Sequence, residues 1–415
     1  MDRDVQARVG SSVDRDRLVE TATDLVAIPS PTGAEAEAAD YLAEQMKNVD
    51  MDVTVQAVED GRANAVGRLR GRGGGRSLML NGHLDTSYSG DESWLEGPGF
   101  KPEPEVRDGS IFGLGIMNMK GAVACYVEAA RALIDSGVEL DGDLVIAGVA
   151  GEIEKAQWTG EFAGSEFRGY GSGTRHLVVH GVVTDGAVLG EPTEERLVLG
   201  HSGTLWARIT TRGPFFHTAF SSGRLAENSI SRMGEIISEI EPWLVEWEER
   251  TEFRGMRGAA SIGAISGGFP WRLSRTPHET HLFVDLRVPP NMNMIEADRS
   301  FRDMVRSLGE KFPDHGIDGE VYVTAPGSEI DETHPLVEAV SSGHEAVHGS
   351  PPERAYVRWG SDAGTLARYG IASLNYGPIS GALPGPEGEQ VPIDSLVNTA
   401  KSYAMTAIEY CGANT

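Results

Sequence analysis

The N-terminal 202 residues alternate short, almost wholly apolar runs with stretches of helical periodicity. Two amphipathic patterns fill residues 14–48, and Pro29 and Pro31 divide them, so we expect two helices there. Continuous apolar runs follow, as expected for strands buried on both faces. These runs are residues 51–58, 64–70, 77–85, 144–150 and 186–192. Because helical stretches such as residues 120–134 separate several of them, the pattern predicts an α/β domain, a mixed sheet with helices on both faces.

The pattern changes at residue 203. From there to residue 318, strands of half-buried character alternate with two long amphipathic helices in the order β-α-β-β-α. That order is typical of a small α+β layer of the ferredoxin-like type. Later strands and helices return to the earlier style. We therefore expect one domain built from residues 1–202 and 319–415, interrupted by an inserted α+β domain at residues 203–318.

Composition and charge narrow the classes of function. Among 415 residues, 62 are acidic and 36 are lysine or arginine, which gives a formal net charge of −26. This charge repels phosphate backbones and anionic headgroups, so we expect no nucleic-acid and no membrane partner. Cys125 and Cys411 are the only cysteines, and they provide neither a disulfide framework nor a thiolate metal cluster. The charged N-terminus and the absence of an apolar run of roughly 18 residues predict a cytoplasmic protein.

Potential metal ligands end three of the predicted buried strands. His83 and Asp85 end one strand, Glu152 and Glu154 a second, and Glu191 a third. In an extended chain His83 and Asp85 share a face, where the carboxylate can orient a metal-bound imidazole. Each of these side chains, taken singly, is more often solvated or hydrogen-bonded than catalytic. Because ligands of open α/β sheets gather at the carboxyl ends of strands, the coincidence of three strands favours a metal site.

These and further motifs resemble, in order, the metallohydrolases that include acetylornithine deacetylase, succinyl-diaminopimelate desuccinylase, carboxypeptidase G and the aminoacylases. The matching segments include "NGHLDT", "FGLGIMNMKGAVA", "VLGEPT", "TTRGPFFHTAFSSGRLAENSI" and "WGSDAGTLARYGIASLNYGP". The resemblance covers nearly the whole chain. It implies a catalytic domain with an inserted lid and dimerisation domain, a homodimer through that lid, and a metal-dependent hydrolase of small molecules.

The chain departs from this family in three places. Asn118 stands where the family has an aspartate that bridges two metals. The stretch ending in Glu152 reads Ala-Gly-Glu where the family has an acidic residue and two glutamates, the first of them the general base. The segment "GALPGPEGEQVPI" lacks the family's last histidine ligand. A neutral amide lacks the charge and the second anionic oxygen that hold two dications about 3.5–4 Å apart.

The departures therefore predict one divalent metal ion, bound by His83, Asn118, Glu191 and Glu152. One imidazole with several oxygens suits Mn²⁺, Zn²⁺ or Fe²⁺, and the oxygen-rich set gives manganese a slight preference. Glu152 is a ligand or the general base, and Glu154 is the poorer candidate.

The resemblance also assigns substrate contacts. It makes Asp85 the partner that orients the metal-bound histidine, and places His217 of a partner subunit at the scissile group. Asn228 and Arg287 bind the polar or carboxylate end of the substrate. From the residues alone, His217 is also compatible with simple packing and Arg287 with an ion pair in a sheet. The predicted catalytic set is thus Glu152, Asp85 and His217.

The substrate expectation follows from the loss of one metal, which weakens stabilisation of an amide oxyanion. We expect hydrolysis of a C–N bond in a small carboxylate-bearing molecule, with a preference for an aromatic amine, as in the similar hydrolase of 5-nitroanthranilate. The segment 157–173, together with Trp271 and Arg272, would form a stacking wall and an anion site. A surface loop is an equally good interpretation of that segment.

Two alternatives stay open. One is a two-metal deacylase or dipeptidase in which Glu387 or Glu389 supplies a missing ligand. The other is a catalytically inactive binding protein. His344 and His348 lie four residues apart on a predicted helix, and we interpret them as part of an exposed helix face rather than as a chelating pair.

Overall fold

The structure is a computed structural model that describes residues 3–156, 168–380 and 385–414. It forms two compact units. Unit 1 comprises Met1–Leu199, Glu329–Ala355 and Ser361–Thr415, and unit 2 comprises Gly200–Ser328 and Tyr356–Gly360. No helix in the described part of the chain is both long and apolar enough to cross a membrane.

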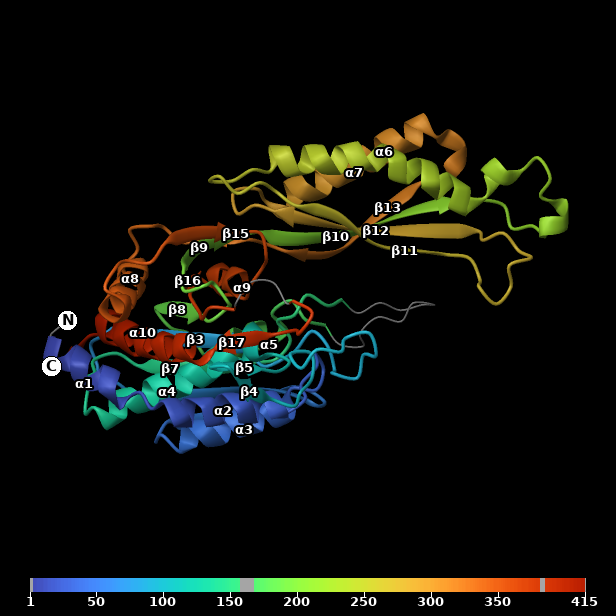
Figure 1. The fold of residues 1–415 in the computed structure, drawn as a ribbon. Helices are drawn as coiled ribbons and strands as arrows, with labels where there is room; N and C mark the ends of the chain where they lie inside the picture. Colours follow the sequence, from blue (N-terminus) through green and yellow to red (C-terminus); the bar gives the residue numbers. More distant parts are fainter. Residues whose placement is uncertain (1–2, 157–167, 381–384, 415) are drawn as a thin grey trace. The chain divides into compact units, whose positions relative to one another are not determined.

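A nine-stranded mixed sheet is the largest element of the fold (Figure 1). Its order is β1-β2-β7-β3-β8-β16-β9-β14, and β15 pairs with β9. The strands are β1 (Asp52–Glu59), β2 (Arg62–Leu69), β3 (Leu78–His83), β7 (Leu144–Val149), β8 (Gly186–Leu189), β9 (Leu197–His201), β14 (Ser328–Glu329), β15 (Arg354–Val357) and β16 (Ala372–Asn375). The four strands β7, β3, β8 and β16 are parallel, whereas β1 and β2 form an antiparallel edge. The continuous apolar runs of β3, β7 and β8 are buried along their whole length, as predicted. For residues 51–58 the prediction is wrong: β1 is the edge strand of the sheet, and all of its residues are exposed or half-buried.

Helices cover both faces of this sheet. They are α3 (Ala36–Lys47), α4 (Gly121–Asp135), α5 (Ser172–Val179), α9 (Ala363–Arg368) and α10 (Ile393–Cys411). On one face, Leu177 of α5 and Leu366 of α9 join a core with Met79 of β3 and its neighbours. On the other face the helices approach so closely that glycine is required: a Cβ on Gly82 would lie 2.8 Å from Val123 of α4, and one on Gly148 would lie 2.2 Å from Leu42 of α3.

Further helices and strands complete unit 1. They are α1 (Arg3–Ser12), α2 (Arg15–Ala27), α8 (Pro335–His348), β4 (Glu105–Arg107), β5 (Ser110–Phe112), β6 (Glu139–Leu140), β17 (Gln390–Pro392) and β18 (Ala413–Asn414). β17 pairs with β5 and places Gln390 opposite Phe112. This pairing brings the segment just before α10 beside the loop that carries Asn118.

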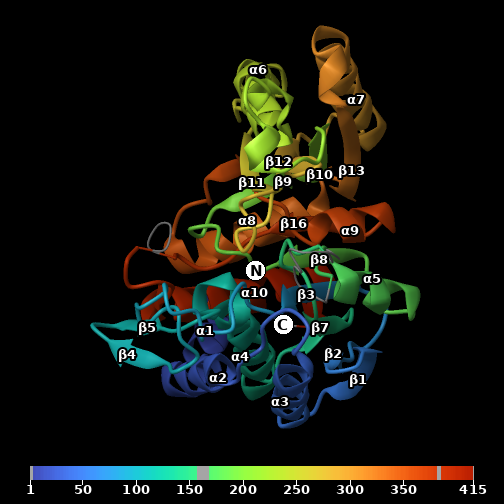
Figure 2. The ribbon, with the colours of Figure 1, turned by 90° about the vertical axis from the view of Figure 1, so that its right-hand side faces the viewer.

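Unit 2 is a four-stranded antiparallel sheet with two helices, in the order β11-β12-β10-β13. Its elements are β10 (Gly203–Arg212), α6 (Ser229–Arg250), β11 (Ala260–Gly267), β12 (Glu279–Val288), α7 (Met294–Lys311) and β13 (Asp318–Ala325). Figure 1 and Figure 2 show both helices on the same face of this sheet. β12 buries every second side chain, and these side chains pack against Ile236 and Trp247 of α6 and Phe301 of α7. The predicted fold class, a mixed-sheet α/β protein with an inserted ferredoxin-like part, is confirmed.

Candidate metal site

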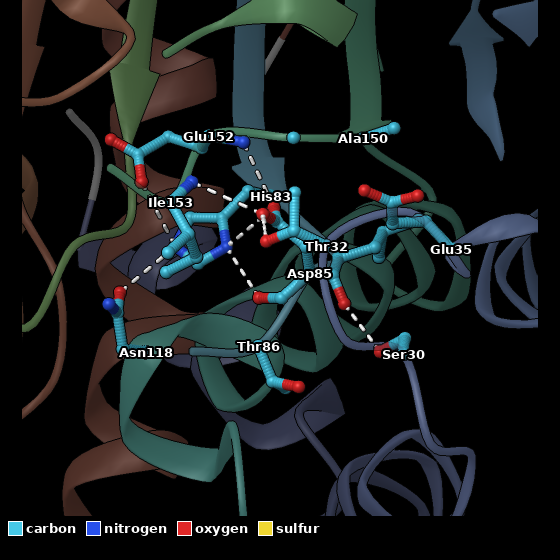
Figure 3. Close-up of polar contacts among 12 residues, drawn as sticks. Ser30, Thr32, Glu35, His83, Asp85, Thr86, Asn118, Ala150, Glu152 and Ile153 are labelled. Carbon is cyan, nitrogen blue, oxygen red and sulfur yellow. Dashed lines mark hydrogen bonds and ion pairs between the residues drawn. The ribbon is translucent and has the colours of Figure 1, made fainter. Parts of the chain in front are cut away.

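Three neighbouring strands place the candidate ligands together at the carboxyl ends of strands in the middle of the large sheet. Because β7, β3 and β8 are parallel, their carboxyl ends meet there. His83 is the last residue of β3, Glu152 follows β7, and Glu191 follows β8. One ligand atom from each of these three residues lies within 4.8 Å of the others. Figure 3 shows His83, Asn118 and Glu152 turned toward one another.

The imidazole of His83 is buried and held at both nitrogens. Nδ1 lies 2.9 Å from the backbone carbonyl oxygen of Asp85 and 3.4 Å from its carboxylate, so the backbone contact is the shorter. Nε2 lies 3.0 Å from Oδ1 of Asn118, 3.8 Å from Oε2 of Glu152 and 4.0 Å from Oε1 of Glu191. The second nitrogen therefore faces three oxygen donors.

Asp85 links the ends of two strands. Its buried carboxylate accepts hydrogen bonds from the backbone N–H groups of Glu152 at 3.0 Å and Ile153 at 3.2 Å, and from the Thr32 hydroxyl at 2.8 Å. Burial by itself raises the pKa of Asp85, but His83 and these donors outweigh it and lower that pKa below its usual value. Asp85 thus fixes both His83 and the backbone of Glu152.

Asn118 lies in a tight turn at Ile116–Lys120, directly before α4. Gly115 enters the turn with φ of 85°, a left-handed conformation suited to glycine, and the Asn118–Met119 peptide bond is cis. The buried carboxylate of Glu389 accepts N–H groups from Gly115, Met117 and Asn118 at 3.0, 3.1 and 3.2 Å. Glu389 therefore holds the turn that presents Asn118.

The His83 imidazole compensates the charge of two buried carboxylates only in part, at 3.8 Å from Glu152 and 4.0 Å from Glu191. Oε1 of Glu191 is buried and has no hydrogen-bond partner among the described residues. Burial raises the pKa of Glu191 to about 7. Burial and the neighbouring Glu191 raise the pKa of Glu152 well above its usual value. Two buried carboxylates that share one imidazole are costly, and a divalent cation is the additional partner that one imidazole and several oxygen atoms fit.

The residues considered as replacements for the family's second-metal ligands lie outside this cluster. Glu389 Oε2 is occupied by the backbone of the Asn118 turn, and exposed Glu387 pairs with Arg107 at 2.7 Å. Over the part of the chain that the structure describes, His83, Glu152 and Glu191 form the one group of three such side chains close enough to share an ion.

Asp362 is a residue near the site that sequence reasoning missed. It is buried, accepts a hydrogen bond from Thr174, and its charge raises the pKa of both Glu152 and Glu191. Burial raises its own pKa to about 6. The segment "WGSDAG" belongs to one of the family-like motifs, but nothing in it indicates which strand ends Asp362 approaches.

His217, Asn228 and Arg287 all belong to unit 2. Nδ1 of His217 accepts the N–H of Ala219, and the side chain of Asn228 caps α6. Arg287 forms an ion pair with Asp285 at 2.8 Å on β12. Their predicted substrate contacts stay predictions.

Other predicted features have mixed outcomes. Trp271 and Arg272 are exposed in unit 2, and residues 157–167 lie outside the described residues. The interpretation of His344 as part of an exposed helix face is wrong: it is 7% exposed, its Nδ1 lies 2.7 Å from the Tyr376 hydroxyl, and its ring stacks on His348. The helical period located the residue but did not identify its face as buried.

The chain is similar in sequence to known enzymes and in fold to solved structures. The chain is 25% identical over 431 residues to N-formyl-4-amino-5-aminomethyl-2-methylpyrimidine deformylase of Bacillus subtilis (strain 168), covering 96% of this chain and 95% of that protein. It is 26% identical to succinyl-diaminopimelate desuccinylase of Gluconacetobacter diazotrophicus, covering 92% and 94%. The fold matches the di-peptidase Dug1p of Saccharomyces cerevisiae with a TM-score of 0.75 at 14% identity, covering 99% of each chain.

The sequence profile of peptidase family M20/M25/M40 matches residues 79–409, which include every candidate ligand. Members of this family of metallohydrolases use divalent metal ions, and the predicted enzyme class, a metal-dependent hydrolase of C–N bonds, is confirmed. The chain belongs to peptidase family M20/M25/M40.

Proposed function

We propose that this protein is a mononuclear metal-dependent hydrolase that cleaves a C–N bond in a small carboxylate-bearing substrate. The observation that carries the proposal is the donor set around His83 Nε2: Oδ1 of Asn118 at 3.0 Å and carboxylate oxygens of Glu152 and Glu191 within 4.0 Å. A neutral amide stands where the family has a bridging carboxylate. This set supports one ion, with Mn²⁺ or Zn²⁺ preferred.

A divalent ion held by these donors supplies Lewis acidity, which lowers the pKa of water and makes it nucleophilic near neutral pH. Glu152 is the best placed proton acceptor, since its side chain is 11% exposed and its pKa is raised well above the usual value by burial. Asp85 keeps the backbone of Glu152 and the ring of His83 in place through its hydrogen bonds. Asp85 is therefore a positioning residue in this scheme.

Unit 2 supplies the substrate contacts in the proposal. His217 polarises the scissile group from a partner subunit, while Asn228 and Arg287 bind the carboxylate end. A homodimer through this unit is supported by β11, an edge strand whose Ile265 is 54% exposed. A cytoplasmic location stays a prediction of the sequence.

An aromatic amine of the 5-nitroanthranilate type is our preferred substrate class, because one ion gives weaker oxyanion stabilisation than two. A two-metal N-acyl amino acid deacylase or dipeptidase is the second candidate. It is favoured by the relatives, which are named for a deformylase, a desuccinylase and a di-peptidase.

Elemental analysis of purified, dialysed protein tests the metal count. We expect one tightly bound ion per chain in the wild type and in a Glu338→Gln control, which changes an exposed carboxylate on α8. Two tightly bound ions in the wild type would contradict the mononuclear proposal and favour the second candidate.

The role of Glu152 needs a separate variant, Glu152→Gln. A general base predicts retained metal and a loss of kcat of about 10²-fold or more on a panel of amides and aromatic amines. A ligand predicts loss of the metal itself. Unchanged metal and unchanged kcat contradict both roles.

A further inference from the structure

Two histidines stack on each other at the carboxyl end of α5, outside the cluster around His83. His176 lies in the last turn of this helix, and His180 is the residue that caps it. Their ring centres are 3.8 Å apart, and the ring planes differ by 20°. His176 is half-buried and His180 is exposed. Residues four apart share a face of a helix, so both imidazoles of this α5 pair lie at one place on the surface of unit 1.

The backbone determines which nitrogen of His180 carries the proton. Nδ1 lies 2.7 Å from the carbonyl oxygen of His176, which also accepts the backbone N–H of His180 at 3.1 Å. A carbonyl oxygen only accepts hydrogen bonds, so Nδ1 of the neutral ring donates and the lone pair lies on Nε2. A backbone carbonyl that holds one ring nitrogen in this way orients the other nitrogen for a metal ion.

The ring of His176 is also available to a ligand. Among the described residues, its nitrogens have no hydrogen-bond or ion-pair partner, and its ring contact is with His180. Burial and the charge of His180 lower the pKa of His176 below its usual value of 6.5. The imidazole is therefore uncharged near neutral pH and keeps a lone pair beside that of its neighbour.

A second stacked pair with the same spacing has different surroundings. The rings of His344 and His348 are 4.1 Å apart on α8. His344 is buried, with Nδ1 2.7 Å from the Tyr376 hydroxyl, and Nε2 of His348 lies 3.7 Å from a carboxylate oxygen of Glu195. Partners within the protein thus occupy this pair. Exposure and free nitrogens, rather than the spacing, distinguish the α5 pair.

The donor set of the α5 pair selects a class of ion. Two neutral imidazoles suit late first-row divalent ions such as Ni²⁺, Cu²⁺ and Zn²⁺, whereas Mg²⁺ and Ca²⁺ prefer oxygen ligands. The net charge of −26 raises the concentration of cations near the surface. α5 has only eight residues, and a helix of that length is marginal by itself, so an ion bound across its last turn would stabilise it.

We propose that the α5 pair binds one late first-row divalent ion through one ring nitrogen of each histidine, which is Nε2 in His180. The site does not rest on the proposed hydrolase function, because it shares no residue with the cluster around His83. Two protein ligands are fewer than the three or four of tight zinc sites, so dialysis removes this ion. The number of tightly bound ions is then that of the cluster alone.

Retention of the untagged full chain on immobilised Ni²⁺-nitrilotriacetate tests the site. The chelator leaves two adjacent coordination positions of Ni²⁺ open, which two imidazoles of one helix face can fill. His83 is 1% exposed and cannot reach an ion on a resin. We expect the wild type to be retained until imidazole is added, and both His176→Gln and His180→Gln to pass through. His348→Gln, the matched control from the other stacked pair, should be retained like the wild type.

Equilibrium dialysis against Ni²⁺ measures the same site in solution. At a free Ni²⁺ concentration that saturates the wild type, His180→Gln should hold one Ni²⁺ fewer per chain, because loss of one ligand weakens the site at least roughly tenfold. The difference does not depend on how many ions the cluster around His83 binds. Circular dichroism checks the folding of each variant, and the two single variants test the pair from either side.

Three results would overturn the proposal: equal retention of the wild type and both α5 variants, loss of retention in His348→Gln, or equal Ni²⁺ content of the wild type and His180→Gln. Failure of the hydrolase proposal would instead show in the count of tightly bound ions and in turnover, which neither experiment measures.

Discussion

Glu191 gives the sharpest test of the metal site, because its replacement should have opposite effects with and without metal. Burial raises its pKa from the ordinary 4.5 to about 7. At about 1.4 kcal/mol for each pKa unit, ionising this carboxylate in the metal-free folded protein costs about 3 kcal/mol. The penalty is absent below pH 4.5, where the group is protonated in both states, and complete above pH 7.

Glu191→Gln removes the penalty and the negative charge together. In chelator at about pH 8, we expect the variant to be more stable to urea than the wild type, by up to about 3 kcal/mol. With Mn²⁺ at roughly 100 times its dissociation constant, the wild type should gain about 2.7 kcal/mol and the variant far less. The two proteins therefore change order when metal is added.

Urea unfolding followed by circular dichroism measures both quantities, with Glu338→Gln as the exposed control. A variant no more stable than the wild type in chelator, or an equal gain of both proteins from Mn²⁺, would contradict these expectations. Equal gains from Mn²⁺ would mean that Glu191 does not bind the cation, and equal stability in chelator would mean that burial does not penalise its ionised form.

Three further predictions concern buried polar side chains of unit 1. Glu389→Ala removes the acceptor of three N–H groups in the Asn118 turn, so the free energy of unfolding in urea should fall by roughly 2–3 kcal/mol. An unchanged urea midpoint would contradict a stabilising role of this contact. Arg62 and Glu35 form an ion pair whose side chains are both 0% exposed. Arg62→Leu leaves the charge of Glu35 buried without its partner, so it should lower the free energy of unfolding by roughly 3–5 kcal/mol in the same assay. Adding Glu35→Leu should recover most of this loss, and no recovery would contradict the explanation by an uncompensated charge. Burial and a neighbouring histidine lower the pKa of His344 from 6.5 to about 4. Its contribution to stability is complete above pH 6.5 and is lost as the pH falls toward 4, by up to about 3 kcal/mol. His344→Phe should flatten the dependence of the free energy of unfolding on pH, measured in chelator. An equal slope in both proteins would contradict this prediction.

Much of the fold could be predicted, because strands that are buried on both faces have continuous runs of apolar residues. The same rule located the ligands: parallel strands share an edge at their carboxyl ends, so His83, Glu152 and Glu191 were expected to converge, and the three side chains do cluster. Asn118 was placed with them by resemblance and lies 3.0 Å from His83.

What escaped prediction depends on contacts between distant parts of the sequence. Glu389 contacts the Asn118 turn from 271 residues away, and Asp362 acts on strand ends that its own motif does not reveal. The helical period placed His344 and His348 on one stripe, but only the packing against Tyr376 shows that His344 is buried. Local pattern identifies an element, and tertiary contacts decide its environment.

The position of β16 decides when the sheet can be completed during synthesis of the chain. This strand lies between β8 and β9 in the sheet, although it follows them by more than one hundred and fifty residues in the chain. A polypeptide leaves the ribosome amino end first, so β7, β3 and β8, which pair with one another and precede or carry Glu152, His83 and Glu191, emerge long before the strand that joins them to β9. The sheet is therefore completed only after most of the chain has left the ribosome, and a chain truncated before Ala372 keeps the three ligand-bearing strands but lacks both β16 and Glu389, the residue that holds the Asn118 turn.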